Sequence, residues 1–176
     1  DAFLSGLSPD GWTVAERDVC RAPAAPCTAC GYCRQTDGCA LHDLDDFDSS
    51  LRACDLLVIA SPVYNLTFPA QLKSVIDRFQ RYFEARFARG VRPAIAKPRR
   101  AVLLLTMGRH DPFSAEICEK MLRQSFSVMN THLAGTLCLT DTDGGIDPEN
   151  PVFEKARRMA IEIAGESCYN NLNLCE

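Results

Sequence analysis

Two uninterrupted apolar runs, Leu56–Ala60 and Ala101–Leu105, most constrain how this chain can fold. A run of strand length that is apolar at every position is typical of a parallel strand buried on both faces. Leu133–Leu139 indicates a third strand. Segments with helical spacing separate these runs, and that alternation places helices on both faces of a parallel sheet. The sequence therefore predicts an α/β fold with a doubly wound sheet.

The remaining elements have weaker local signals. Trp12–Val19 alternates as a strand does, and Asn150 followed by Pro151 is typical of a helix start. A short helix ending at Ala53 could be capped by Asp48 or Ser49. Apolar spacing predicts the other helices, which cover residues 2–7 (ending near the turn at 8–11), 69–88, 114–129 and 150–164.

Length, charge and apolar content limit the class of protein. A chain of 176 residues suits one domain over 1–176, with a Cys-rich insertion at about 20–46. The net charge of −4 argues against a nucleic-acid partner. No run approaches the roughly 18 apolar residues that span a bilayer, and the first residues carry no signal-peptide pattern. We therefore expect a cytoplasmic protein with no membrane partner.

The segment after the first apolar run has the features of a site for a planar ring. Ser61, Pro62, Val63, Tyr64 and Asn65 follow a buried strand, where open α/β sheets bind their ligands. Proline fixes the backbone, tyrosine supplies a flat face, and free backbone amides can bond the polar edge of a ring. An ordinary strand-to-helix turn with a surface tyrosine is the alternative.

Four cysteines fall within thirteen residues, at Cys27, Cys30, Cys33 and Cys39. Thiolates every third residue can surround one compact centre, and Gly31 favours the tight backbone that this requires. A zinc site usually takes two cysteine pairs separated by a longer loop, so the spacing disfavours zinc. Free or oxidised thiols remain an alternative. The six other cysteines are scattered, at Cys20, Cys54, Cys118, Cys138, Cys168 and Cys175.

Ser61-Pro62-Val63-Tyr64, followed by Gln71-Leu72-Lys73 and Ile76-Asp77-Arg78, resembles the NADPH-dependent FMN reductase and iron–sulfur flavoprotein family of the flavodoxin-like superfamily. The resemblance implies a five-stranded parallel sheet of order 2-1-3-4-5 with FMN at residues 61–65. It also implies that the flavin's pyrimidine side lies near Thr106, Met107 and Gly108. The four clustered cysteines resemble that family's motif for one [4Fe–4S] cluster.

Family members open with a strand and a loop that binds the FMN phosphate, and neither precedes Asp1 in this sequence. We expect the native chain to begin earlier, so that the phosphate loop lies outside this sequence. A rearranged form of the fold is the alternative.

The acidic segment 141–147 is expected to form a flap near the cofactor of the same or a neighbouring subunit. After Gly108, Arg109 and His110 either favour the reduced flavin or form a solvated turn.

The resemblance implies an enzyme that passes electrons from NAD(P)H or a ferredoxin-type donor to acceptors through FMN and a [4Fe–4S] cluster. No side chain is expected to be catalytic, because the cofactor carries the chemistry. Three alternatives stay open: a cluster-free NAD(P)H:FMN or quinone reductase, a non-enzymatic flavodoxin-type carrier, and a zinc-stabilised binding module.

The helix predicted over residues 69–88 has more apolar surface than one sheet face needs, which predicts a homodimer or homotetramer. The alternative is that all four of its aromatic rings are core residues: Phe79, Tyr82, Phe83 and Phe87.

Overall fold

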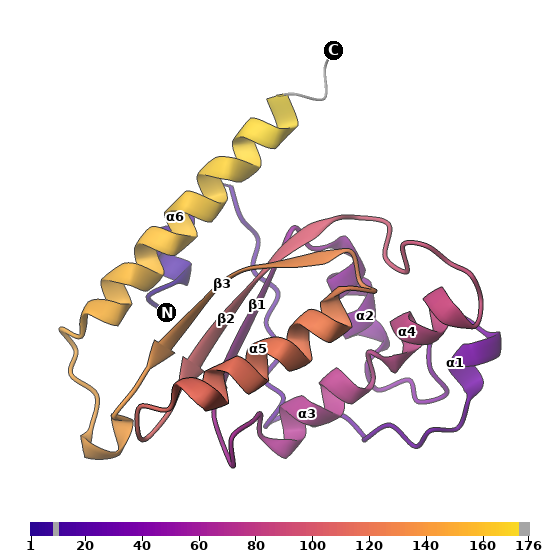
Figure 1. Cartoon of the computed structure of the whole chain (residues 1–176). Helices are drawn as coiled ribbons and strands as arrows, with labels where there is room; N and C mark the ends of the chain where they lie inside the picture. Colours follow the sequence, from indigo (N-terminus) through magenta and orange to yellow (C-terminus); the bar gives the residue numbers. More distant parts are fainter. Residues whose placement is uncertain (9–10, 173–176) are drawn as a thin grey trace.

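The computed structural model describes residues 1–8 and 11–172, with side chains described as far as residue 165. Its sheet has three parallel strands in the order β1-β2-β3: β1 (Leu56–Pro62), β2 (Arg99–Thr106) and β3 (Thr131–Leu139) (Figure 1). All three strands predicted from apolar runs are therefore confirmed, each longer than expected by two or three residues. Part of the turn expected at residues 8–11, Pro9 and Asp10, lies outside the described residues.

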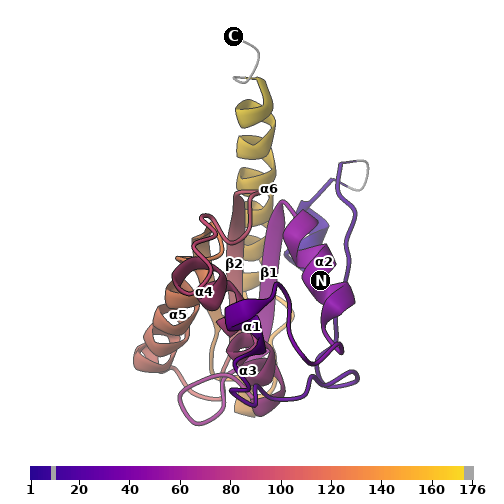
Figure 2. The ribbon, with the colours of Figure 1, turned by 90° about the vertical axis from the view of Figure 1, so that its right-hand side faces the viewer.

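Helices cover both faces of this sheet. On one face lie α2 (Asp45–Ala53), α3 (Ala70–Asp77), α4 (Gln80–Phe87) and α5 (Pro112–Phe126). On the other lie α6 (Pro151–Leu172) and the short 3-10 helix η1 (Leu4–Gly6), as Figures 1 and 2 show. The doubly wound α/β prediction is confirmed, although the sheet of the described residues has three strands rather than the five that the resemblance implies. Among the described residues, no helix is both long and apolar enough to cross a bilayer.

The central strand explains why its sequence is apolar at every position. Ala101, Leu103 and Leu105 pack with the helices of one face, whereas Val102 and Leu104 pack against α6 and η1. Successive side chains of a strand point to opposite faces, so a strand covered on both sides has no position left for a polar residue.

The strand predicted over Trp12–Val19 is wrong. In the structure this segment has no regular secondary structure, and most of its side chains are exposed. A strand is held by hydrogen bonds to a neighbour, and no strand in the described ranges pairs with this segment. Alternating polarity alone cannot distinguish such an extended segment from a strand. At the start of the chain, the helix predicted over 2–7 is reduced to η1.

The single helix predicted over 69–88 is broken in two. Between α3 and α4, the Phe79 amide donates to the Ile76 carbonyl (3.0 Å) and the Tyr82 amide donates to the Phe79 carbonyl (2.9 Å). These i→i+3 bonds tighten the turn and change the direction of the chain. Neither proline nor glycine marks the break, so the sequence offered no local signal for it. Arg78, which lies at the break, has a buried side chain.

The other helix ends follow local capping chemistry. Asn150 accepts a hydrogen bond from the Val152 amide (3.0 Å) and Pro151 opens α6, as predicted. Asp111 caps α5 in the same way, through the Phe113 amide. The cap predicted for the short helix at Asp48 or Ser49 is wrong, because α2 already begins at Asp45. The Cys-rich segment (residues 20–46) also contains a four-residue helix, α1 (Tyr32–Gln35).

Candidate functional site

The turn after β1 presents an exposed ring beside a strained backbone. Tyr64 is 61% exposed. Its amide and carbonyl both bond Thr67, which closes a four-residue turn at 2.8 and 3.1 Å. At the two central positions, Asn65 and Leu66 have φ values of 49° and 69°. Non-glycine residues rarely adopt this left-handed conformation, and such outliers concentrate at ligand sites.

This turn also offers backbone donors. In the described part of the chain, no atom accepts a hydrogen bond from the amides of Asn65 and Leu66. Earlier in the segment, Ser61 is buried and its hydroxyl donates to the carbonyl of Pro62 (2.8 Å). The polar groups available to a ligand are therefore on the Tyr64–Thr67 turn rather than on the serine.

The loop after β2 lies beside that turn. The Val63 amide donates to the Thr106 carbonyl (2.9 Å), which ties the two strand ends together. Met107 is buried, and its amide donates to the Leu139 carbonyl (2.9 Å). Within the described ranges, the amides of Gly108 and the exposed Arg109 have no acceptor. The eight residues predicted to contact the cofactor are thus brought together at the carboxyl edge of the sheet.

The chemistry of these donors fits a flavin. Its isoalloxazine ring has N5 and two carbonyl oxygens as acceptors, and the edge of the sheet supplies unpaired amides at Asn65, Leu66, Gly108 and Arg109. The exposed ring of Tyr64 can cover one face. Leu66 was missed from the sequence, since nothing in its residue type signals a left-handed backbone.

The predicted flap over 141–147 also reaches this edge. It contains the 3-10 helix η2 (Thr142–Gly144), and the Thr142 amide donates to the Met107 carbonyl (3.3 Å). The side chain of Asp143 lies against Gly108. Sequence patterns predicted the position of the flap at this end of the sheet but not the contact of this carboxylate.

The four clustered cysteines lie on the Cys-rich segment, away from helix interiors except for Cys33 on α1. Cys27 and Cys30 are exposed, whereas Cys33 and Cys39 are half-buried. Burial raises the pKa of the Cys33 thiol, and Glu84, Cys39 and Cys27 add to the increase. In the placement that the structure describes, however, no three metal-ligating side chains are close enough together to bind one ion. As placed, the thiols do not fit a metal or an iron–sulfur cluster.

The backbone of this segment is nevertheless tightly turned, as the cluster motif predicted. Gly31 and Gly38 have φ values of 76° and 94°, and Ala29 adopts 53°. Among the other cysteines, Cys118 is buried in the core. The side chains of Cys168 and Cys175 lie outside the described residues.

A buried arginine connects the two ends of the Cys-rich segment, and nothing in the sequence indicated this role. The side chain of Arg78 is 2% exposed. One of its terminal nitrogens donates to the Ala25 carbonyl (3.1 Å) and to Asp43 (2.8 Å), and the other donates to the Leu41 carbonyl (2.6 Å). Its partners flank the four cysteines on both sides in sequence. A single guanidinium therefore holds the two ends of that loop together, and it does so from the turn at which α3 ends and α4 begins.

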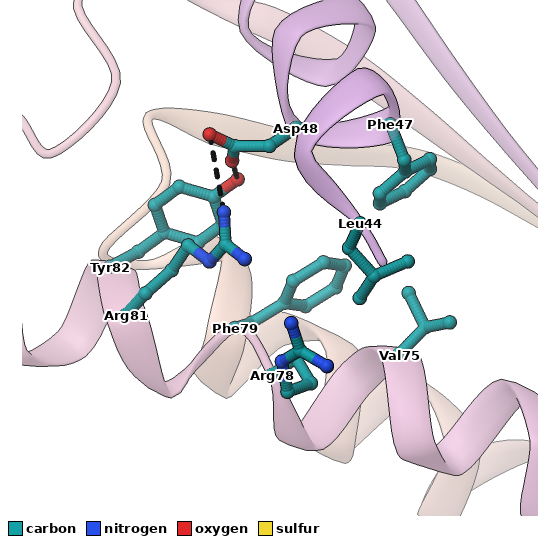
Figure 3. A pocket seen from close by; sticks show the side chains of 8 residues that line it. All are labelled: Leu44, Phe47, Asp48, Val75, Arg78, Phe79, Arg81 and Tyr82. Atoms are coloured by element: carbon teal, nitrogen blue, oxygen red, sulfur yellow. Dashed lines mark hydrogen bonds and ion pairs between the residues drawn. The ribbon is translucent and has the colours of Figure 1, made fainter. Parts of the chain in front are cut away.

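A second polar contact lies one turn further along, in the pocket drawn in Figure 3. Asp48 accepts hydrogen bonds from Tyr82 and from Arg52 and forms an ion pair with Arg81 (3.3 Å). Both Arg81 and Tyr82 are buried. This pocket lies between α2 and the α3–α4 junction, where side chains of the protein satisfy the carboxylate. It is a structural contact between helices rather than a site for the cofactor.

Comparison with known proteins identifies the fold. The model of the family described as flavodoxin-like fold matches residues 1–163. The iron-sulfur flavoprotein of Methanosarcina thermophila is 47% identical over 74 residues, which cover 42% of this chain and 36% of that protein. An FMN-dependent NADH:quinone oxidoreductase of Pectobacterium atrosepticum is 34% identical over 86 residues, 48% of this chain and 43% of that protein. The chain thus matches less than half the length of these curated relatives.

Among solved structures, an NAD(P)H:quinone oxidoreductase from Methanothermobacter marburgensis superposes with a TM-score of 0.64. The match has 21% identity and covers 93% of this chain and 83% of the other. At this identity the similarity establishes the fold alone. Together with the two motifs around β1 and α3, the family match confirms the resemblance stated above: the chain belongs to the family of proteins with a flavodoxin-like fold.

Proposed function

We propose that this chain binds FMN at the carboxyl ends of β1 and β2 and works as an FMN-dependent oxidoreductase. The observation that carries the proposal is the pair of adjoining turns whose amides at Asn65, Leu66, Gly108 and Arg109 lack an acceptor in the described residues. The names of relatives support it, since they include iron-sulfur flavoproteins and FMN-dependent NADH:quinone oxidoreductases.

When bound, FMN supplies the chemistry of hydride and electron transfer. The residues of this chain bind and orient it. Tyr64 covers one face of the ring, and the amides of Asn65 and Leu66 donate to its polar edge. Buried Met107 and the bond from Val63 to Thr106 keep the two turns in register, so the donors remain fixed with respect to each other.

FMN binding is tested by titrating the apoprotein with FMN and following the quenching of flavin fluorescence. We expect one FMN per chain. Tyr64→Ala should weaken binding about tenfold, because stacking on an aromatic ring contributes roughly 1–3 kcal/mol. The control is Ile161→Ala, which removes an exposed apolar side chain from the other face of the sheet. A wild type that binds no FMN, or equal affinities in Tyr64→Ala and wild type, would contradict the assignment.

For the electron donor, we propose NAD(P)H, with a ferredoxin-type protein as the alternative. Steady oxidation of NAD(P)H with added quinone or flavin supports an enzyme. Reversible reduction by a ferredoxin-type donor, without nicotinamide oxidation, supports a non-enzymatic electron carrier. Rapid mixing of the FMN-loaded protein with each donor distinguishes the two.

We further propose that Cys27, Cys30, Cys33 and Cys39 take up a [4Fe–4S] cluster, for which the Cys-rich segment must bring the four thiols closer together than they lie in this structure. The support is their spacing, the positive φ of Gly31 and Gly38, and the name of the Methanosarcina relative. Anaerobic reconstitution with iron and sulfide should give four irons per chain. Cys33→Ser should lose them, whereas Cys20→Ser, an exposed cysteine outside the motif, should retain them.

The thiols as placed form no metal site in the described chain, and this observation favours one alternative, a cluster-free NAD(P)H:FMN or quinone reductase. Flavin without iron after reconstitution would select it. A colourless protein that takes up zinc would indicate a binding module instead. A cytoplasmic location forms part of the cluster proposal, because the thiols must remain reduced to bind iron.

The homodimer or homotetramer predicted from the aromatic helix is also a proposal. Of its four rings, Phe79 and Tyr82 are core residues, whereas Phe83 and Phe87 are 42% and 56% exposed. Their ring centroids lie 4.4 Å apart, so the two form one apolar patch on α4. A second copy of the chain would bury this patch.

A further inference from the structure

The segment that follows β3 brings a carboxylate to the proposed FMN site. Gly108 lies in the loop between β2 and α5, and the three atoms nearest to the position of a Cβ on this glycine are Oδ1, Oδ2 and Cγ of Asp143. All three are closer than a real Cβ tolerates. The absence of a side chain at Gly108 therefore makes room for the carboxylate of Asp143.

Backbone bonds connect the residues beside Asp143 to the loop after β2. Asp141 adopts a left-handed conformation (φ 62°), which turns the chain back toward the sheet. The Thr142 amide donates to the Met107 carbonyl (3.3 Å), and the Gly145 amide donates to the Thr142 carbonyl (3.1 Å). The residue before Asp143 is thus bonded to the residue before Gly108.

The carboxylate itself has no protein partner. Across the residues with described side chains, no hydrogen bond or ion pair engages Asp143. By contrast, Asp147 in the same flap accepts a hydrogen bond from the Glu149 amide (2.9 Å). Asp143 is exposed, so its carboxylate is an acceptor at the edge of the site that is available to a ligand.

The chemistry of the ligand restricts what this acceptor can bond. An ionised carboxylate accepts hydrogen bonds and donates none. The ring of oxidised FMN offers a single N–H donor, at N3 of its pyrimidine portion, whereas its N5 and carbonyl oxygens accept. A carboxylate near those acceptors would be repelled, and near N3 it would be paired.

We propose that Asp143 accepts the hydrogen bond of the flavin N3–H and so selects the orientation of the ring in the site. This inference rests on the proposed FMN binding and adds a positioning residue to it. The ribityl hydroxyls are the competing donors, and the experiment separates them from N3–H.

The test compares the affinities of the apoprotein for FMN and for 3-methyl-FMN, in which a methyl group replaces the N3 hydrogen, by fluorescence quenching. Wild type should bind FMN at least about tenfold more tightly, as expected for a hydrogen bond to a charged group. Asp143→Ala should lose this preference, because its affinity for FMN should fall by the same factor. Its affinities for FMN and 3-methyl-FMN should then differ by no more than about twofold. Asp147→Asn, which changes the same charge in the same flap, should discriminate like wild type.

Two further measurements keep the assignment separate from a folding defect. Gly108→Ala places a methyl group where the carboxylate lies, so it should also lose discrimination while retaining the wild-type circular dichroism spectrum. With lumiflavin, which has no ribityl chain, the effect of Asp143→Ala should persist; its disappearance would move the bond to a ribityl hydroxyl and overturn the proposal. Discrimination in Asp143→Ala equal to that of wild type would also overturn it. If wild type binds no flavin at all, the proposed function fails as well.

Discussion

Replacing Arg78 tests whether a single buried guanidinium holds the base of the Cys-rich segment. In Arg78→Met the apolar stem is retained, whereas the ion pair with Asp43 and the bonds to the carbonyls of Ala25 and Leu41 are lost. Removing one partner of a fully buried pair costs roughly 3–5 kcal/mol. Asp43, however, is 34% exposed and keeps its bond from the Ala25 amide (2.7 Å). Water can therefore replace part of the loss.

The expected decrease in the free energy of unfolding is about 3 kcal/mol. Roughly 1 kcal/mol comes from the solvent-screened ion pair, and roughly 1 kcal/mol from each carbonyl left without its donor. In urea, with an m value of about 2 kcal/mol/M, the midpoint should fall by about 1.5 M. Arg78→Lys keeps the charge but not the planar, fork-shaped set of donors. Its free energy of unfolding should therefore fall by about half as much as that of Arg78→Met.

The control is Arg123→Met, which removes an exposed ion pair with Glu119 (3.4 Å) from α5. Exposed ion pairs contribute little to stability, so the free energy of unfolding of Arg123→Met should differ from wild type by no more than about 0.5 kcal/mol. An Arg78→Met protein as stable as this control would refute the role assigned to the guanidinium.

The cost of Arg78→Met should also depend on pH. Burial alone would raise the pKa of Asp43, but the Ala25 amide and the Arg78 guanidinium outweigh it and hold this pKa below its ordinary value. A carboxyl group whose pKa is lower in the folded than in the unfolded protein stabilises the fold at any pH above its unfolded pKa, about 4. This stabilisation is lost as the pH falls from that value through the folded pKa. The difference between wild type and Arg78→Met should therefore narrow below about pH 4.

Three other predictions follow from buried or exposed side chains. Tyr82→Phe removes a buried hydrogen bond to Asp48 and should lower the free energy of unfolding by about 1–2 kcal/mol in urea; an unchanged midpoint would count against that bond. Replacing Phe83 and Phe87 together by serine should convert an oligomer to monomer in sedimentation velocity, and an unaltered sedimentation coefficient would place the interface elsewhere. Burial, with a further effect of the neighbouring Cys138 thiol, raises the pKa of Cys118 to about 11, so iodoacetamide at pH 8 should modify it only after unfolding.

The three strands of the sheet and the cap of α6 were determined largely by the sequence itself. Leu56–Ala60 and Ala101–Leu105 were recognisable as strands because burial on both faces requires an apolar residue at every position. Asn150 capped α6 as predicted, because a cap depends only on atoms two residues away. The sequence also placed the site residues Pro62 and Tyr64 at the edge of the sheet, because they lie at the end of a strand that its apolar run identifies.

Contacts between distant segments were decided only by the tertiary structure. The break between α3 and α4 accompanies Arg78 reaching Asp43, 35 positions earlier in the chain. Trp12–Val19 has the alternation of a strand but no strand beside it among the described residues. Asp143 matters because Gly108, on a different loop, leaves space for its carboxylate. Periodicity and capping report on neighbours within a few residues, whereas these contacts depend on which segments the packing of two sheet faces brings together.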